Sequence, residues 1–62
     1  RRAEEVYAYN AAAGYHNRFV ELFRAERYLE AEALILEGLE ALPRTDLLRN
    51  DLNLVRRALE RE

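Results

Sequence analysis

The stretch from Glu26 to Leu48, ERYLEAEALILEGLEALPRTDLL, decides the fold that we expect for this chain. Its pattern predicts the end of one helix, a complete second helix, a tight turn at Pro43 and the start of a third helix. Proline ends a helix because its ring removes a backbone donor and disfavours helical geometry in the residue before it. The remaining residues extend these helices, so the sequence predicts an all-α fold.

The second helix, expected over about 28–42, is apolar on two faces. One face comprises Tyr28, Ala31, Ile35, Gly38, Leu39 and Leu42, and the other comprises Leu29, Ala33 and Leu36. A helix that is apolar over this much of its circumference must have neighbours on two sides. We therefore expect other helices, or another protein, to cover both faces.

The first helix, expected over about 2–25, carries its clearest apolar stripe in its second half. The stripe consists of Tyr15, Phe19, Leu22 and Phe23, spaced i, i+4, i+7 and i+8. Gly14 costs about 1 kcal/mol relative to alanine in a helix interior, so a break over 10–14 is the alternative to one long helix. We expect one long helix, because the range contains no strong stop signal.

The third helix, expected over about 46–60, follows Thr45, which is a good amino-terminal cap. Its inner stripe consists of Leu48, Leu52, Val55 and Leu59. A chain of 62 residues makes one domain at most and buries only about 60% of its unfolded surface. We expect a single domain of marginal stability over 1–62, and a start at Arg1 rather than Met is compatible with a piece of a longer protein.

The composition argues against several classes of function. The net charge is −2, and acidic and basic residues are interspersed along the chain. A nucleic-acid footprint needs basic residues clustered on one face, and a membrane span needs about 20 mostly apolar residues in a row. We therefore expect no nucleic-acid partner and no membrane insertion. The absence of Cys excludes a disulfide and a thiol nucleophile but identifies no compartment; we favour a cytoplasmic location.

The letters YLEAEALILEGLEALP place an aromatic residue at Tyr28, a small residue at Ala31, Ile35 four residues later and Pro43 at the end. This spacing resembles the second half of the tetratricopeptide repeat (TPR), a helix–turn–helix unit of about 34 residues. The resemblance extends over about 15–59, one repeat plus one further helix. It implies an antiparallel helical hairpin of TPR type, followed by a third helix that resembles the polar cap of a TPR array.

The first helix departs from the TPR pattern. Arg18 stands at the position of its Leu, and Phe19 stands at the position of its Gly. We interpret Phe19 as filling the space left by the small residues Ala31 and Gly38 opposite it, as close packing requires. Because any amphipathic hairpin with a Pro turn matches part of the pattern, a generic three-helix bundle or a helical hairpin dimer is the alternative.

The sequence predicts neither catalysis nor a cofactor. His16 is the only histidine, and its neighbours at i±3 and i±4 include no carboxylate, Ser or Cys, so we interpret it as a surface or groove-lining residue. Metal binding or acid–base catalysis would need carboxylates that converge in a pocket. We interpret the carboxylates in and before the second helix as a solvated face: Glu26, Glu30, Glu37 and Glu40. We expect no enzyme activity, no cofactor and no metal.

The three helices carry more apolar surface than their mutual contacts can cover. The surplus, our candidate interface, consists of Tyr7, Tyr9, Leu29, Leu36, Leu47 and Leu54. A single repeat rarely suffices for stability, since stacked neighbours normally complete its core. We therefore expect a protein partner: a second copy in a homodimer or other homo-oligomer, or another subunit of a larger complex. The expected function is that of a non-catalytic scaffold or adaptor.

Two alternatives remain open. The TPR resemblance implies a concave face that holds an extended peptide, which here would be lined by His16, Asn17, Val20, Arg24 and Asn50, with Ala13 and Leu54 as apolar neighbours. The second and third helices could also form a DNA-binding helix-turn-helix that uses Arg49, Arg56 and Arg57. Acidic residues on the same third helix argue against a phosphate-facing surface, namely Asp46, Asp51, Glu60 and Glu62.

Overall fold

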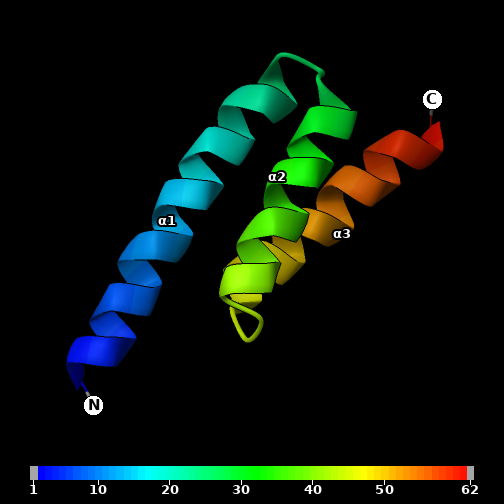
Figure 1. Ribbon diagram of the computed structural model, residues 1–62. Helices are drawn as coiled ribbons and strands as arrows, with labels where there is room; N and C mark the ends of the chain where they lie inside the picture. Colours follow the sequence, from blue (N-terminus) through cyan, green and yellow to red (C-terminus); the bar gives the residue numbers. More distant parts are fainter. Residues whose placement is uncertain (1, 62) are drawn as a thin grey trace.

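The protein consists of three helices in a computed structural model that describes the backbone of residues 2–61 and the side chains of residues 10–61 (Figure 1). The prediction of an all-α fold is confirmed, and residues 2–61 contain no strand. The predicted ranges, 2–25, 28–42 and 46–60, differ by one residue at three helix ends from the observed helices: α1 (Arg2–Arg24), α2 (Tyr28–Ala41) and α3 (Asp46–Arg61).

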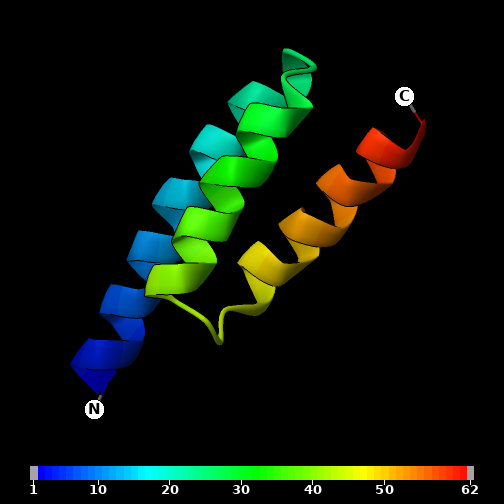
Figure 2. The ribbon, with the colours of Figure 1, turned by 45° about the vertical axis from the view of Figure 1, so that its right-hand side comes forward.

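Each helix contacts the other two. The chain reverses direction at both connections, so that α1 and α3 run one way and α2 runs the other (Figures 1 and 2). Beside the first turn, the ring centroids of Phe23 and Tyr28 lie 5.1 Å apart. Farther from that turn, Tyr15 of α1 lies against Gly38 of α2. The contacts therefore pair earlier residues of α1 with later residues of α2.

The first turn is closed by Glu26, whose φ angle of 60° places it in the left-handed region. The N–H of Glu26 donates to the carbonyl of Phe23 at 3.0 Å, and the N–H of Arg27 donates to the carbonyl of Leu22 at 3.0 Å. These two bonds form a Schellman motif, which satisfies carbonyls that the end of a helix leaves without intrahelical partners. Glycine usually occupies the left-handed position of this motif.

The second turn begins after Ala41 and ends at Thr45. The N–H of Leu42 donates to the carbonyl of Gly38 at 2.8 Å, and the carbonyl of Thr45 accepts the N–H of Arg49 at 3.1 Å. A residue whose carbonyl accepts the first intrahelical bond occupies the N-cap position. Thr45 therefore stands where the sequence predicts the start of α3.

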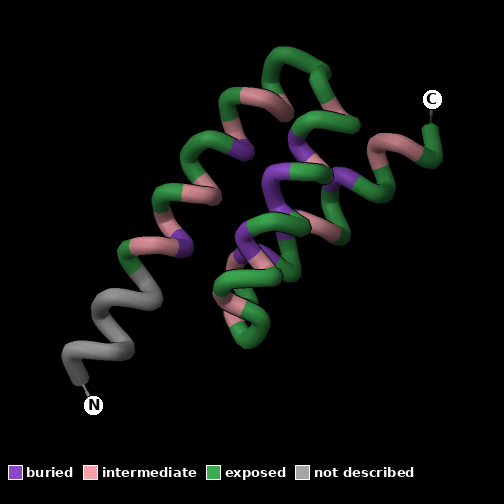
Figure 3. The backbone as a smooth tube through the Cα atoms, in the orientation of Figure 1, coloured by how far each residue is buried: buried purple, intermediate pink, exposed green. Residues whose placement is uncertain are grey.

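The core lies where the three helices meet (Figure 3). Its buried members come from all of them: Ala12, Phe19, Ala31, Leu34, Ile35, Leu48 and Val55. The partly buried side chains of Tyr15, Val20, Leu22, Phe23, Tyr28, Leu39, Leu42, Leu47 and Leu52 pack against this cluster. The predicted inner stripes of α1, α2 and α3 therefore contribute to one apolar core.

Gly38 is the position where α1 and α3 both come close to α2. A Cβ atom at Gly38 would lie 3.0 Å from Cδ1 of Leu48 and 3.0 Å from Cγ of Tyr15. Phe19 is buried, as its large side chain predicts, but the side chains nearest to Gly38 are those of Tyr15 and Leu48. The antiparallel register explains this difference, because Tyr15 precedes Phe19 by one turn and thus faces a later residue of α2.

Candidate functional site

The candidate interface residues fall into three groups. Leu29, Leu36 and Leu54 are 71%, 44% and 46% exposed. Leu47 is partly buried and packs against the core, so it contributes less free surface than predicted. Tyr7 and Tyr9 lie outside the residues whose side chains the structure describes.

Two of these exposed leucines belong to one stripe on α2. Leu29, Ala33 and Leu36 are all exposed and are spaced i, i+4 and i+7, which places them on one side of the helix. The buried residues of α2 occupy the opposite side: Ala31, Leu34, Ile35 and Gly38. We call the exposed set Leu29, Ala33 and Leu36 the α2 stripe. It points away from the core, and no described residue covers it.

The surroundings of the α2 stripe are acidic. α2 contains four glutamates and no basic residue: Glu30, Glu32, Glu37 and Glu40. Arg27 binds Glu30 through two hydrogen bonds of 2.7 and 2.8 Å, and Arg56 reaches Glu32 at 3.2 Å. Neither Glu37 nor Glu40 forms an ion pair with a side chain within residues 10–61. The stripe is therefore an apolar line beside Glu37 and Glu40, two carboxylates that form no ion pair with a side chain within residues 10–61.

Among the groove candidates, His16 has a partner that the sequence reasoning missed. Its Nδ1 lies 2.7 Å from Oδ2 of Asp51, which connects α1 to α3. The Asp51 side chain is only 8% exposed, whereas that of His16 is 33% exposed. Because a carboxylate only accepts, Nδ1 of His16 must carry the hydrogen. Asp51, one of the acidic residues of the third helix named above, is therefore buried and contacts His16.

A signal for this pair was present in the sequence. Asp51 lies three residues after Leu48 and four before Val55, so it belongs to the side of α3 that faces the core. A buried carboxylate needs a hydrogen-bonding partner. The i±3 and i±4 neighbours of His16 all lie on its own helix, whereas Asp51 is 35 residues away in the sequence.

The other groove candidates are distributed around this pair. Asn17, Arg24 and Asn50 are exposed, while Val20 is partly buried and packs against the core. Asn17 follows His16 on α1, and Asn50 precedes Asp51 on α3, so the structure brings both helices of the predicted groove together at the His16–Asp51 contact.

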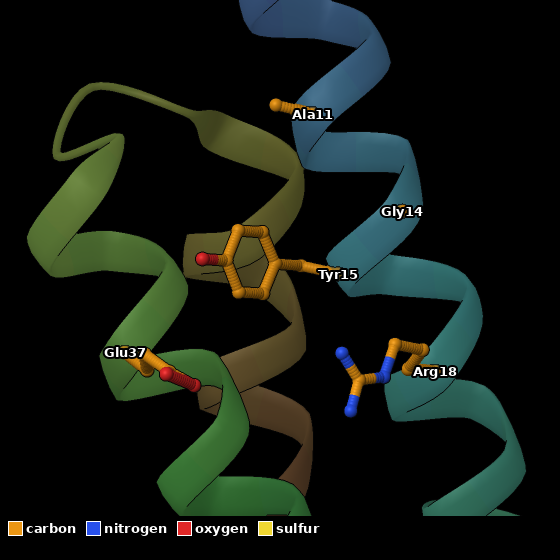
Figure 4. Close-up of a pocket in the computed structure, with 5 residues that line it drawn as sticks. All are labelled: Ala11, Gly14, Tyr15, Arg18 and Glu37. Atoms are coloured by element: carbon orange, nitrogen blue, oxygen red, sulfur yellow. The ribbon is translucent and has the colours of Figure 1, made fainter.

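A separate depression of about 360 Å³ lies between α1 and α2 (Figure 4). Its lining comprises Ala11, Gly14, Tyr15, Arg18 and Glu37. The side chains of Arg18 and Glu37 point toward each other across its opening (Figure 4). The sequence reasoning did not predict this depression, which includes none of the candidate site residues. Within the described part of the chain, no group of three His, Asp or Glu side chains is placed to hold a metal ion.

Replacing His16 with alanine tests the contact between α1 and α3. We expect His16→Ala to lower the free energy of unfolding by about 1–3 kcal/mol, because the buried carboxylate of Asp51 loses its partner. The exposed neighbour variant Asn17→Ala should change it by less than about 0.5 kcal/mol. Urea denaturation, monitored by circular dichroism, measures the free energy of unfolding of both variants. In a double-mutant cycle with Asp51→Ala, additive losses would contradict an interaction between the two side chains.

Within residues 2–61, no helix combines the length and the apolar character that crossing a membrane requires. The likeness to a tetratricopeptide repeat rests on the residues quoted above. Comparisons of the chain with protein-family models, with curated proteins and with solved structures found no match.

Proposed function

We propose that this chain is a non-catalytic protein–protein interaction module, a small TPR-like scaffold or adaptor that acts by self-association or by docking in a larger complex. The observation that carries this proposal is the α2 stripe. Its leucines are 71% and 44% exposed, on the side of α2 opposite the core. Exposed leucines that are scattered singly are common on protein surfaces, but these two and Ala33 form one line along a helix.

The arrangement of the stripe supports binding to another helix. Apolar anchors at i, i+4 and i+7 are the usual means by which one helix packs on another protein surface. Burial of a leucine side chain contributes about 1.5–3 kcal/mol. Leu29 and Leu36 are 71% and 44% exposed, so burying what remains exposed of both contributes about 2–3 kcal/mol. This is part of the free energy that a micromolar complex needs, about 8 kcal/mol.

Sedimentation equilibrium over a range of concentrations tests the self-association arm of this proposal. We expect the wild-type chain to associate and Leu36→Asp to weaken that association about ten-fold or more, because a charge would be buried against apolar groups. Asn53→Asp is a matched control, since it adds the same charge at an exposed position of α3. A wild-type chain that stays monomeric throughout would exclude self-association and leave docking in a complex with another subunit.

A second candidate function is the binding of an extended peptide along α1 and α3. It is favoured by the exposed amides of Asn17 and Asn50, which are the sequence neighbours of His16 and Asp51 and can hydrogen-bond a peptide backbone. The exposed Leu54 adds an apolar contact. The acidic Asp51 beneath this surface favours a peptide segment over a terminal carboxylate.

The nucleic-acid alternative receives less support. It depends on free arginines on α3, whereas Arg56 reaches back to Glu32 of α2 at 3.2 Å. An arginine that pairs with a carboxylate of its own chain contributes less to phosphate binding. We therefore base the proposed function on protein partners.

A further inference from the structure

We propose that the α2 stripe of one copy of this chain binds a second, basic stripe on α3 of another copy, so that the copies associate head to tail. This inference rests on the self-association arm of the proposed function and names its two complementary surfaces. The second surface, which we call the α3 stripe, consists of Asn50, Leu54, Arg57 and Arg61.

The α3 stripe is a continuous exposed line. Its four residues are all exposed and are spaced i, i+4, i+7 and i+11, so they lie on one side of α3. Leu54 is the apolar centre of the line and is 46% exposed. Arg57 and Arg61 follow it, and neither forms an ion pair with another side chain within residues 10–61. The stripe is therefore apolar in the middle and basic at its carboxyl-terminal end.

The two stripes are complementary in spacing and in charge. Glu40 extends the α2 stripe to i+11, so that both lines have the same length along their helices. When the two helices are set side by side in parallel with Leu36 level with Leu54, Glu40 and Arg57 lie within one residue of the same level, about 1.5 Å apart along the helix axis. One leucine of each stripe then meets the other, with opposite charges beside the pair, an arrangement that gives a helix interface both affinity and register.

The α3 stripe lies on a different side of the molecule from the α2 stripe. On α3, Arg56 reaches Glu32 of α2 and Asp51 contacts His16 of α1. Leu54 lies closer around the helix to Asp51 than to Arg56, so the α3 stripe borders α1 and faces away from α2.

Two different surfaces that face different directions cannot form a self-complementary patch. A contact between them is heterologous, and such contacts produce chains of copies or rings, whereas a two-fold dimer uses the same patch on both subunits. The structure therefore points to association that continues beyond the dimer as the concentration rises.

A mixing experiment tests this inference. Leu36→Asp disrupts only the α2 stripe, and Leu54→Asp disrupts only the α3 stripe. We expect each variant alone to be monomeric in sedimentation equilibrium at concentrations where the wild-type chain associates. An equimolar mixture should recover association but stop at the heterodimer, because one variant supplies an intact α3 stripe and the other an intact α2 stripe.

The control for the added charge is Asn10→Asp, at an exposed position of α1 outside both stripes, which should associate like the wild-type chain. Circular dichroism confirms that each variant is folded, and Leu36→Ser with Leu54→Ser repeats the experiment if an aspartate variant unfolds. In the mixture, adding Glu40→Arg to the Leu54→Asp chain should weaken the heterodimer several-fold.

Three results would overturn the inference. If Leu54→Asp alone still dimerises while Leu36→Asp does not, two α2 stripes bind each other, and the proposed function stands without the head-to-tail contact. If the mixture of the two folded variants stays monomeric, the stripes do not bind each other. If the wild-type chain is monomeric throughout, self-association fails as well, and docking on a different protein is what remains of the proposed function.

Discussion

Phe19→Ala is expected to leave most of the chain unfolded at room temperature. Phe19 is only 1% exposed and belongs to the single core that all three helices share. Truncation of a buried phenylalanine to alanine costs about 3–5 kcal/mol, through lost apolar burial and the cavity left behind. At the usual values per residue, a chain of 62 residues is stabilised by only about 3–9 kcal/mol. The loss is therefore comparable to the whole free energy of folding.

Far-ultraviolet circular dichroism at increasing temperature measures this effect. The wild-type chain should lose its helical signal in one transition, whereas Phe19→Ala should show little helix even before heating. Leu29→Ala is the control, since Leu29 is 71% exposed and its truncation should change the stability by less than about 0.5 kcal/mol. If Phe19→Ala melted within a few degrees of the wild-type chain, the shared core described above would be wrong.

Gly38→Val is expected to cost about 2–3 kcal/mol, the upper part of the range for overpacking a core. The first added carbon atom would already lie 3.0 Å from both Leu48 and Tyr15. Leu48 is fully buried, so it has little room to move, and the second branch of valine adds to the crowding. Because the clash involves α1 and α3 at once, we expect both to shift away from α2.

Gly14→Ala is the matched control for Gly38→Val, because both glycines lie within helices and neither has a positive φ angle. Apart from its own stretch of helix backbone, nothing lies within 4 Å of a Cβ at Gly14, so alanine there should stabilise α1 by about 0.5–1 kcal/mol through its helix propensity. Urea denaturation of the two variants measures the difference. A Gly38→Val variant as stable as the wild-type chain would show that the helices do not approach closely at this point.

The helices were predictable because the spacing of apolar residues along the sequence indicates which side of each helix is buried. The stripes of α1 and α3 contain Phe19, Leu48 and Val55, which are all fully buried. Pro43 and Thr45 marked the second turn, since each has a definite effect on helix ends. The Schellman motif at Glu26 was not predictable in the same way, because Gly or Asn is the usual signal for its left-handed residue.

Contacts between helices were harder to predict than the helices themselves. Sequence spacing shows which residues share one face, but the register between two helices depends on how their side chains interlock. This is why Phe19 was expected opposite Gly38, where the structure places Tyr15 and Leu48. The pair of His16 and Asp51 was missed for the same reason, since its members are 35 residues apart.

The exposure of three residues of the candidate interface was predictable from the sequence. Leu29, Leu36 and Leu54 are exposed, and these positions followed from an excess of apolar residues over the faces that three helices can bury. Leu47 is partly buried, because residues at the edge of an inner stripe can turn toward either the core or the solvent. The roles of these residues in binding remain predictions that the experiments above test.

The distance in sequence between His16 and Asp51 also determines the order in which contacts can form during folding. The turns over 25–27 and 42–45 are short. Closing them costs little entropy, so the α1–α2 and α2–α3 pairs can form early. His16 and Asp51 are 35 residues apart and meet only after both turns are in place. We therefore expect the contact between α1 and α3 to be the last to form. A partner that spans α1 and α3 would therefore act on the final step of folding and slow its reversal.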